Sequence, residues 1–573
     1  MVSKMLLAAA TATTLLTPLT SAATLPRKTT GVQCSNSTTF TPISAADFVS
    51  KMDPGWNLGN TLDAVETEGS WNNPPVQPAT FDDIKASGYK GIRLPVTWAY
   101  HFTSSSPDWN VDPVWLQRVS DVIDMITSRG LYTIVNVHHD SWIWADITKA
   151  DANITAIEER FYRLWYQIGV KLACKPSLVA FEPINEEPGT TEEHGKQVNK
   201  LNEIFLTAIN EAGGYNPDRV VTLVGAGEDG AKTTLWFKRP DEKRFKNPWA
   251  LQYHYYSPYD FIFGAWGKTI WGGAADKASM ETDLSIVRGN FTDVPIVIGE
   301  WSASMVATEN TARWKYVDFF LRTARKYKTA TVVWDNGADS FDRGAKKWRD
   351  EVTQNILMNA SAGVPNALPK STEDAGAESQ FSDGYVYHKI GEEVKDAKLG
   401  FNLNGNILEY ARLAGKKVNL QQDLEYDFST SADGKEGTVT FKAGFLTPLF
   451  ASGGAIDKRS GSAALKLGSV ANISLTFNAG ADLLVNVLQW DVPTLTLTNT
   501  SKLVTGADLL VPIKWAGQNR PAAIRAVKKD GSYLVDDWTQ WLGPLQRGRL
   551  VSFLFRHDIS GKFLQAWRLT YFE

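Results

Sequence analysis

The sequence predicts an α/β fold, a (β/α)8 TIM barrel, followed by two small all-β sandwich domains. Between about residues 55 and 337, eight short apolar runs rich in β-branched residues alternate with longer segments of helical period. Strands that alternate with helices pair in parallel, and eight such repeats fit a closed barrel better than an open sheet. After about residue 380, short strand-like runs separated by turns indicate β-sandwiches. A chain of 573 residues is also too long for one hydrophobic core.

The predicted barrel strands are short apolar runs that cover residues 56–61, 91–98, 131–137, 178–184, 220–224, 251–256, 294–299 and 331–334. Amphipathic segments lie between them. In one of these, the apolar residues fall on one face of a helix, at Trp115, Val119, Val122, Ile123 and Ile126. No glycine-rich phosphate loop follows the first strand, which argues against a nucleotide-binding fold.

The N-terminus has the features of a secretory signal peptide. Lys4 precedes an apolar run that ends near Leu19, and the small residues 21–23 follow it. We therefore expect residues 1–23 to be removed and the protein to be secreted and extracellular. Residues 24–360 would form the barrel domain, 361–379 a linker rich in Ala, Ser, Pro and Gly, and 380–490 and 491–573 the two β domains.

Charge, hydropathy and cysteine content exclude several classes of partner. The formal net charge of −4 offers no attraction for a polyanion, so no nucleic acid is expected. No run after the signal peptide is long and apolar enough for a membrane anchor. Cys34 and Cys174 could form a disulfide in an oxidising compartment or remain buried thiols. Six sequons would accept glycans in a eukaryotic host, at Asn36, Asn153, Asn290, Asn359, Asn472 and Asn499.

Polar residues gather at the C-terminal ends of six of the eight predicted strands. In a barrel these ends share one rim, and a rim of unpaired buried charge would be costly without a function. The residues are Arg93, His138-His139-Asp140, Asn185-Glu186-Glu187, His254 with Tyr256, Glu300-Trp301 and Trp334-Asp335-Asn336.

Two carboxylates on this rim suit cleavage of a glycosidic bond. One acid must protonate the leaving oxygen, while the other attacks the sugar or stabilises its positive charge. Arg93 would keep Glu300 ionised as the nucleophile, and Glu186, with less compensating charge, would stay protonated as the acid. A zinc site with His138 and His254 is the alternative, but no zinc-binding spacing such as H-E-x-x-H is present. We therefore expect no metal and no cofactor.

These segments together resemble glycoside hydrolase family 5, and more narrowly its fourth subfamily, which contains endoglucanases and xyloglucanases. The resemblance covers roughly residues 36–360 and rests on Gly55-Trp56-Asn57-Leu58-Gly59-Asn60-Thr61-Leu62-Asp63-Ala64, Arg93-Leu94-Pro95-Val96-Thr97-Trp98, Val137-His138-His139-Asp140, Phe181-Glu182-Pro183-Ile184-Asn185-Glu186, Tyr253-His254-Tyr255-Tyr256-Ser257-Pro258, Gly299-Glu300-Trp301 and Trp334-Asp335-Asn336-Gly337.

The resemblance implies a retaining mechanism with Glu186 as acid/base and Glu300 as nucleophile. It also implies substrate or nucleophile contacts by Arg93, His138, Asn185, His254, Tyr256 and Trp334, to which we add the neighbouring His139 and Trp301. One departure is that Glu187 stands where the family usually has proline directly after the acid/base. Glu187 is therefore a second candidate for the acid. Glu182 is interpreted as a partner for a base inside the barrel.

Several tryptophans in the predicted loops and tail are candidates for sugar stacking, with core packing as the alternative: Trp142, Trp144, Trp266, Trp271, Trp538 and Trp541. Residues 380–490 resemble an immunoglobulin-like X-type module, through Leu403-Asn404-Gly405-Asn406 and Leu475-Thr476-Phe477-Asn478-Ala479-Gly480-Ala481. Residues 491–573 resemble carbohydrate-binding module family 46, through Asp530-Gly531 and Trp538-Thr539-Gln540-Trp541.

The expected function is a monomeric endo-β-1,4-glucanase that acts on cellulose, mixed-linkage glucan or xyloglucan. A β-mannanase on the same scaffold and a non-catalytic glucan-binding protein are the alternatives.

Overall fold

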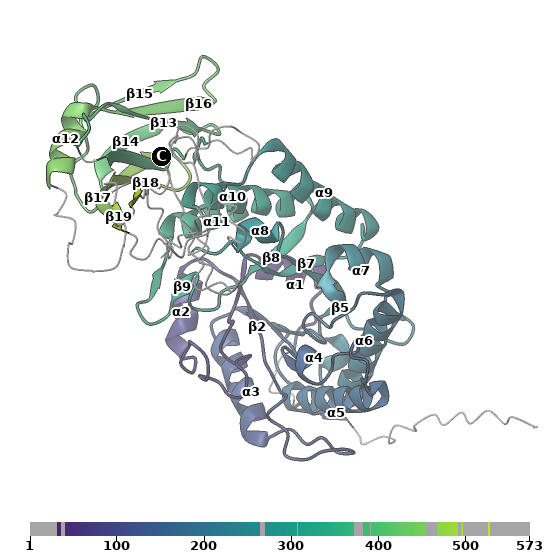
Figure 1. Cartoon of the computed structure of the whole chain (residues 1–573). Helices are drawn as coiled ribbons and strands as arrows, with labels where there is room; N and C mark the ends of the chain where they lie inside the picture. The colour runs from purple at the N-terminus through teal and green to yellow at the C-terminus, as the bar shows by residue number, and fades with distance from the viewer. Residues whose placement is uncertain are drawn as a thin grey trace, which may run out of the picture.

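The computed structural model describes residues 31–35, 40–263, 270–305, 308–371, 382–389, 391–452 and 467–490, and two short strands at 494–496 and 525–527. Its N-terminal domain is a closed barrel of eight parallel strands, so the predicted fold class is confirmed (Figure 1). Each strand pairs with the next, and β1 pairs with β8. The strands are β1 (Gly55–Asn57), β2 (Gly91–Leu94), β3 (Tyr132–Val135), β4 (Val179–Phe181), β5 (Val221–Asp229), β6 (Trp249–Tyr255), β7 (Ile296–Trp301) and β8 (Thr329–Val333).

The barrel strands are buried on both faces, as expected for parallel strands between helices and a packed interior. Every residue of β1, β2, β4, β7 and β8 is buried. The largest departure from prediction is β5, which was expected at residues 220–224 but continues to Asp229. Its pairing with β6 shifts register between Val224 and Asp229. Gly225 and Gly227 lie inside this irregular stretch, where residues without a side chain permit a bulge.

Helices follow the strands and form the outer layer (Figure 1). In α3 the predicted stripe from Trp115 to Ile126 is buried, and the Asp112 side chain caps the helix by accepting a hydrogen bond from the Val114 backbone N–H. The helices are α2 (Pro78–Ala86), α3 (Pro113–Thr127), α4 (Asp140–Ile143), α5 (Ile154–Leu172), α6 (Glu192–Ala212), α7 (Gly230–Trp236), α8 (Tyr259–Ile262), α9 (Ala274–Asn290), α10 (Asn310–Lys326) and α11 (Glu351–Ala362).

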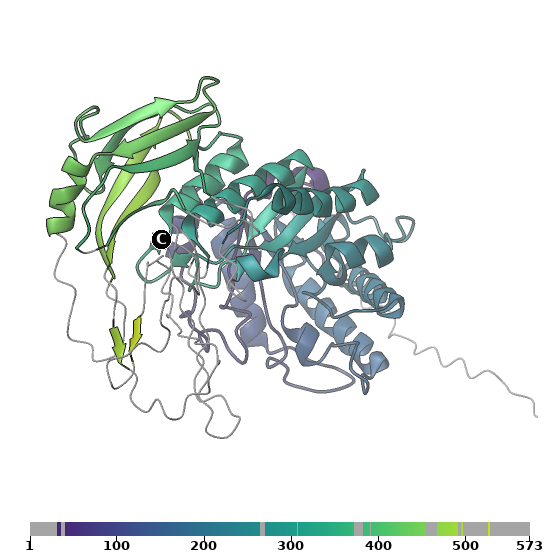
Figure 2. The ribbon, with the colours of Figure 1, turned by 45° about the horizontal axis from the view of Figure 1, so that its top comes forward.

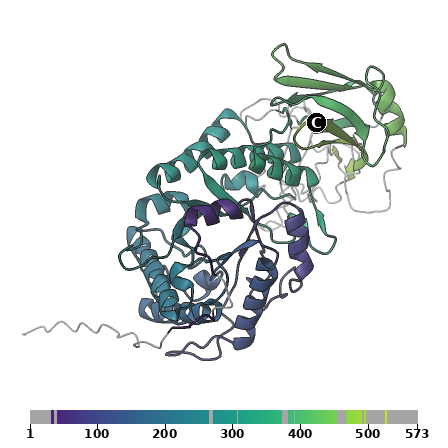
Figure 3. The same cartoon turned by 180° about the vertical axis from the view of Figure 1, so that it is seen from behind.

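A helix before the first strand, α1 (Ala45–Met52), closes the N-terminal end of the barrel, as the view from behind shows (Figure 3). Phe48, Val49 and Met52 pack into a small apolar cluster with residues from the beginnings of the strands, such as Ile134 and Val297. The opposite end, where the strands terminate, is therefore the open face of the barrel.

Cys34 and Cys174 form a disulfide, with Cα atoms 5.5 Å apart. The bond joins the N-terminal segment to the residues just after α5. The alternative of two buried free thiols is therefore excluded.

The second domain is a sandwich of two four-stranded sheets that lies beside α10 and α11 (Figure 2). Leu399, Phe401 and Val439 from one sheet and Leu475 and Val487 from the other are buried in its core. One sheet has the order β11 (Leu368–Pro369), β13 (Ala397–Asn402), β16 (Glu436–Phe441), β15 (Tyr426–Thr430). The other has the order β12 (Tyr385–Lys389), β18 (Leu483–Trp490), β17 (Leu467–Phe477), β14 (Leu408–Leu413), and α12 (Ala443–Ser452) follows β16.

The expectation of a linker at residues 361–379 is wrong for its first part. Asn366 is fully buried and Leu368–Pro369 pair with β13, so the sandwich begins before residue 380. The side chain of Asn366 donates to Asp318 Oδ1 of α10 at 2.7 Å and accepts from the Ala481 backbone N–H at 3.0 Å. Asn366 is a polar residue in a segment whose composition suggested a linker. It is nevertheless buried, because hydrogen bonds to both domains satisfy its side chain. Residues 372–379 lie outside the described part.

Two other expectations fall mainly on residues that the structure does not describe. These are the signal peptide at 1–23 and the second sandwich at 491–573, of which only β19 (Thr494–Thr496) and β20 (Arg525–Val527) are described. Among the described helices, none has both the length and the apolar character needed to span a bilayer.

Candidate active site

Two glutamates meet at the open end of the barrel, although 114 positions separate them in the chain. Glu186 lies five residues beyond the end of β4, and Glu300 lies within β7. One oxygen of each carboxylate and one ring nitrogen of His254 all lie within 4.8 Å of one another. The rim therefore brings the predicted pair together with an ionisable base.

Glu300 is buried and held from two sides. Arg93 Nη1 donates to Glu300 Oε1 at 2.5 Å, and the Tyr256 hydroxyl donates to Oε2 at 3.0 Å. Burial raises the pKa of Glu300, and the positive charges of His254 and Arg93 offset part of that rise. These two donors fix the carboxylate in one orientation. Arg93 and Tyr256 thus occupy the positions expected for contacts to the nucleophile.

Arg93 is itself fully buried among acceptors. Its Nε and Nη2 form a fork on Glu182 at 2.7 and 2.6 Å, Nη1 also reaches Asn57 Oδ1 at 3.0 Å, and Nη2 reaches Asn185 Oδ1 at 2.7 Å. Glu182 is therefore the partner of a base inside the barrel, as interpreted from the sequence. The bond from Arg93 also orients the amide of Asn185 beside Glu186.

Glu186 lies at the surface of the cleft, with a side chain 44% exposed. Its Oε1 is 2.8 Å from His254 Nδ1, and its backbone has a left-handed φ of 45°. Burial raises the pKa of Glu186, but the hydrogen bond to His254 and the charge of that ring outweigh burial and lower it. The expectation that Glu186 has less compensating charge than Glu300 is therefore wrong, because the sequence does not reveal that His254 pairs with Glu186.

Glu187, the second candidate for the acid, is fully buried in a separate environment. Its Oε1 accepts the Ile147 backbone N–H at 3.1 Å. Burial raises the pKa of Glu187 well above its usual range. The Glu187 carboxyl group is buried and hydrogen-bonded to the segment between α4 and α5, so it does not reach the cleft. The geometry therefore favours Glu186 as the acid.

Glu228 is a member of this cluster that the sequence analysis missed. It lies in the irregular part of β5, fully buried, with its Oε2 3.2 Å from His254 Nε2. Burial raises the pKa of Glu228 to about 7. The signal available in the sequence was the acidic pair Glu228-Asp229 just beyond the run assigned to the fifth strand, which had no rim residue. Gly225 and Gly227 interrupt the apolar run between residue 224 and Glu228.

His138 and Trp334 form the floor of the site. Their rings are stacked, with centroids 5.8 Å apart and planes 3° apart. Burial and the neighbouring charges of His139, Arg93 and His254 lower the pKa of His138 well below its usual range, so its ring is neutral. The half-buried Trp334 covers Gly59, where a Cβ atom would come within 2.6 Å of the indole. Only glycine leaves room for this aromatic surface.

An aromatic surface continues outward from His138 through His139. Trp142 Nε1 donates to His139 Nδ1 at 2.9 Å, and the Trp71 ring lies 5.4 Å from the His139 ring. Trp71 and Trp142 are 38% and 49% exposed. His139 thus contacts two exposed indoles rather than the two glutamates.

The rim has exposed rings on its other side as well. Phe263 packs 5.8 Å from Tyr256 and 4.8 Å from Tyr259, measured between ring centroids, and both Phe263 and Tyr259 are exposed. A cavity of about 390 Å³ opens beside Glu186 and is lined by the ends of β5 and β6, the start of α7 and one face of α9. Apolar rings therefore extend from the two glutamates in two directions.

The prediction that Trp301 contacts the substrate is wrong, because its side chain is buried. It is 1% exposed and packs against Phe320 with ring centroids 4.4 Å apart. Successive residues of a strand point to opposite faces, so Glu300 faces the site and Trp301 faces the helices.

Of the other tryptophans proposed for sugar stacking, Trp271 is also buried, and Trp144 is half-buried with its Nε1 hydrogen-bonded to Asp140. Trp266, Trp538 and Trp541 lie outside the described residues.

Two groups of side chains in the described residues have donor atoms close enough to hold a metal ion: Asp63 with His138 and His139, and Glu186 with His254 and Glu300. In the first, the Asp63 carboxylate already accepts the backbone N–H groups of Asn60 and Thr61. In the second, the neighbouring carboxylates raise the pKa of His254 to about 9 against the effect of burial, and a protonated ring offers no lone pair to a metal. Both groups are better explained by hydrogen bonding and proton transfer.

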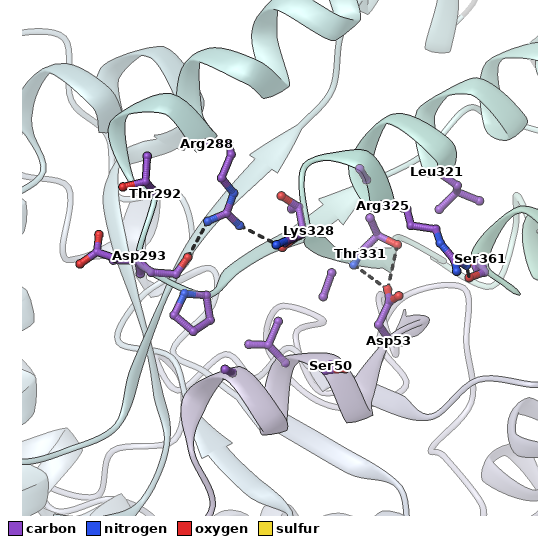
Figure 4. A pocket seen from close by; sticks show the side chains of 17 residues that line it. Ser50, Asp53, Arg288, Thr292, Asp293, Leu321, Arg325, Lys328, Thr331 and Ser361 are labelled. Atoms are coloured by element: carbon purple, nitrogen blue, oxygen red, sulfur yellow. Dashed lines mark hydrogen bonds between the residues drawn. The ribbon is translucent and has the colours of Figure 1, made fainter. Parts of the chain in front are cut away.

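A second cavity, of about 400 Å³, lies at the closed end of the barrel against α1 (Figure 4). Asp53 in its wall accepts the Thr331 backbone N–H at 2.9 Å, and Arg288 donates to the Lys328 carbonyl. None of the predicted site residues lines this cavity. The candidate chemistry is confined to the opposite end of the barrel.

Two facing carboxylates on the C-terminal rim of a (β/α)8 barrel are the arrangement with which a glycoside hydrolase cleaves its substrate. Comparison with known proteins agrees. A family model described as Cellulase (glycosyl hydrolase family 5) matches residues 55–340. Endoglucanase B of Paenibacillus lautus is 29% identical over 517 residues, which cover 87% of this chain and 84% of that protein.

Solved structures extend the similarity beyond the barrel. A tri-modular family 5 (subfamily 4) endo-β-1,4-glucanase from Bacillus licheniformis is 34% identical, with a TM-score of 0.68 over 82% of this chain and 85% of that chain. A structure of such an enzyme from the same organism, complexed with cellotetraose, has the same identity and TM-score over 83% and 85%. The chain belongs to glycosyl hydrolase family 5 and is a glycoside hydrolase of the endoglucanase type.

Proposed function

We propose that the protein is a secreted, retaining endo-β-1,4-glucanase with Glu186 as acid/base and Glu300 as nucleophile. The observation that carries this proposal is the approach of the two carboxylates, with one oxygen of each within 4.8 Å of the other. Retaining glycosidases hold their carboxyl groups about 5 to 5.5 Å apart, and inverting enzymes hold them about 6.5 to 9.5 Å apart to admit a water molecule. The separation here supports double displacement.

In the first step, Glu300 attacks the anomeric carbon and forms an ester bond to the sugar. The glycosidic bond breaks, and the leaving oxygen takes a proton from Glu186. Arg93 and Tyr256 hold the attacking carboxylate at 2.5 and 3.0 Å. The proton that Glu186 needs is adjacent, since His254 Nδ1 lies 2.8 Å from its Oε1.

In the second step, the Glu186 carboxylate removes a proton from water, and the resulting hydroxide attacks the anomeric carbon. The ester bond to Glu300 breaks, and the product keeps the original anomeric configuration. The half-exposed position of Glu186 gives water access to it, whereas buried Glu300 is shielded from bulk water.

A β-glucan is the substrate that best fits the surface around this pair. The flat faces of glucose rings pack on aromatic side chains, and Trp334 with His138 offers such a face at the catalytic centre. Exposed rings continue on both sides, with Trp71 and Trp142 on one and Phe263 on the other. A surface that extends both ways suits cleavage within a chain, and the similar Bacillus licheniformis enzyme was crystallised with cellotetraose.

Two assays test this function against its alternatives. Hydrolysis of carboxymethylcellulose, barley β-glucan, xyloglucan and glucomannan should show activity on the glucans, whereas a β-mannanase would act on glucomannan alone. Glu300→Gln should lower kcat by several orders of magnitude and still bind cellotetraose. A wild-type protein that binds glucan without any turnover would identify a non-catalytic binding protein instead.

Secretion and the accessory role of the tail belong to the same proposal. The Cys34–Cys174 disulfide supports an oxidising compartment, in agreement with the signal peptide expected at residues 1–23. We further propose that the sandwich is the immunoglobulin-like module and that residues 491–573 form the carbohydrate-binding module of a monomeric enzyme. Mass spectrometry of the secreted protein tests cleavage after residue 23, and binding of the isolated enzyme to insoluble cellulose tests the tail.

A further inference from the structure

Glu228 has contacts that the proposed mechanism does not use. The mechanism requires an acid/base, a nucleophile and the donors around them, and Glu228 is none of these. Yet its carboxylate is fully buried next to the two groups that handle the proton, Glu186 and His254. A buried carboxylate needs compensating partners, and their identity indicates what it does.

We propose that Glu228 is a positioning residue for the acid/base, fixing both the backbone of Glu186 and the charge of His254 without touching the substrate. This inference rests on the proposed function, because it assigns Glu228 a task only if Glu186 is the acid/base.

The first support is the contact to the Glu186 main chain. Glu228 Oε2 accepts the Glu186 backbone N–H at 2.9 Å, and Oε1 accepts Gln252 Nε2 at 2.9 Å. Gln252 lies on β6, so the carboxylate is fixed by the neighbouring strand while it holds the loop after β4. A second tie joins the same segments, since the Gly227 backbone N–H donates to the Glu187 carbonyl at 2.7 Å.

The second support is the backbone conformation at both ends of this contact. Glu186 and Glu228 have φ angles of 45° and 47°, in the left-handed region that L-residues rarely adopt. Such conformations persist only where surrounding contacts hold them, and they are frequent at functional sites. The carboxylates of both residues lie beside His254, with Glu186 Oε1 2.8 Å from Nδ1 and Glu228 Oε2 3.2 Å from Nε2. The hydrogen bond between them stabilises both turns together.

The third support is the position of His254 between two carboxylates. Nδ1 lies 2.8 Å from Glu186 Oε1, and Nε2 lies 3.2 Å from Glu228 Oε2. A carboxylate beside each ring nitrogen favours the charged imidazole, because the positive charge then lies between two negative groups. Nδ1 is hydrogen-bonded to Glu186, whereas Nε2 makes no aligned hydrogen bond, so its contact with Glu228 is electrostatic.

The other charged groups around His254 do not replace this contribution. Glu300 of β7 is more distant, with its Oε2 3.8 Å from Nδ1, and it is already engaged by Arg93 and Tyr256. Glu186, after β4, also favours a positive charge on His254, but it acts on the Nδ1 side of the ring. His138, after β3, opposes that charge, because the two rings repel each other when both are protonated. Glu228 is therefore the carboxylate that compensates the Nε2 side of the ring.

The test exploits the dependence of acid catalysis on the leaving group. Cellotetraose has a poor leaving group that needs the proton from Glu186, whereas 2,4-dinitrophenyl β-cellobioside releases a stable phenolate that does not. Loss of acid/base positioning should lower kcat/KM on cellotetraose by about 100-fold and change kcat/KM on the aryl glycoside by no more than about threefold. A general loss of structure would lower both alike.

Two substitutions separate the two parts of the role. Glu228→Gln keeps an oxygen that can accept the Glu186 N–H but removes the charge, and Glu228→Ala removes both. We expect the larger selective loss for Glu228→Ala. The nearly isosteric Glu228→Gln decides the question if the alanine variant does not fold. Glu187→Gln is the matched control, because it changes another buried carboxyl group, next to Glu186 in the loop after β4, that bonds Ile147 rather than His254. It should leave kcat/KM on both substrates unchanged.

Titration of the histidine rings gives a second readout that a purely structural role would not change. The chain has seven histidines, and 15N-labelled histidine spectra can be assigned to His254 by comparison with His254→Gln. The pKa of His254 should fall by at least about one unit in Glu228→Gln, because a negative charge beside Nε2 is removed, and stay unchanged in Glu187→Gln.

Equal losses on both substrates, or no loss on either, would overturn the role of Glu228, as would an unchanged His254 titration. Failure of the proposed function would look different, because the wild-type protein itself would then hydrolyse neither substrate.

Discussion

Arg93 Nη1 lies 2.5 Å from Glu300 Oε1, while Nε and Nη2 of the same guanidinium donate hydrogen bonds to the Glu182 carboxylate. One buried cation thus joins Glu300 of β7, the proposed nucleophile, to Glu182, a structural carboxylate that directly follows β4. A forked donor is required, because two carboxylates and two amide oxygens are satisfied at once. The site therefore depends on the shape of arginine as well as on its charge.

Replacing Arg93 by lysine should keep the charge but lose this geometry. We expect Arg93→Lys to lower kcat/KM on cellotetraose by about 100-fold or more, because a preorganised donor to Glu300, the proposed nucleophile, is removed. Arg313→Lys is the control, since Arg313 is equally buried but bonds Asp350 and Thr353 on the outer layer of the barrel. It should affect the midpoint of thermal unfolding, with kcat/KM of the folded enzyme preserved. Equal kinetic losses in the two variants would contradict this account.

The charge of His254 should make stability depend on pH. Burial lowers its pKa, but Glu228, Glu300 and Glu186 outweigh burial and raise it to about 9 from an ordinary value near 6.5. A folded-state pKa above the unfolded one stabilises the protein fully below about pH 6.5, and this stabilisation is lost as pH rises through about 9.

The loss amounts to at most about 3 kcal/mol, from 1.36 kcal/mol per pKa unit. Urea unfolding at pH 6 and pH 9 measures it as the difference between wild type and His254→Gln. Parallel pH dependences for the two proteins would show that His254 does not carry this charge.

The disulfide should contribute measurably to stability. It closes a loop between positions 140 residues apart and joins the N-terminal segment to the end of α5. Replacing Cys34 and Cys174 by serine should lower the free energy of unfolding by about 2 to 4 kcal/mol, and the midpoint of thermal unfolding by several degrees. Reducing the wild-type protein should reproduce the shift and leave the double variant unchanged. A wild-type unfolding midpoint that does not change on reduction would show that the disulfide does not stabilise the fold.

Trp142 and Trp301 should respond in opposite ways to substitution. Trp142 is 49% exposed on the rim, whereas Trp301 is 1% exposed against Phe320. Trp142→Ala should raise KM for long cello-oligosaccharides by about threefold to tenfold through lost stacking, with kcat and stability preserved. Trp301→Phe should lower the unfolding midpoint and leave KM unchanged. A KM effect at Trp301 without loss of stability would contradict its assignment to the core.

Local patterns were enough to predict the barrel and most of its rim. Eight apolar runs separated by helical segments specify parallel strands, and residues such as Arg93, Glu186 and Glu300 follow from the rule that parallel strands end on one rim. Boundaries were less accurate where glycine or proline interrupts a pattern. The sandwich begins at Leu368, because Asn366 finds its partners in Asp318 and Ala481, which are remote in the chain.

The sequence by itself determined which residue types stand at the strand ends, because strand period and strand direction are local properties of the chain. The tertiary structure alone decided which of these residues meet. Trp301 faces the core because Glu300, its neighbour in the strand, faces the site. The irregular stretch of β5 places Glu228 beside His254, which in turn pairs with Glu186. Electrostatic coupling depends on distances between segments far apart in sequence, and folding alone sets those distances.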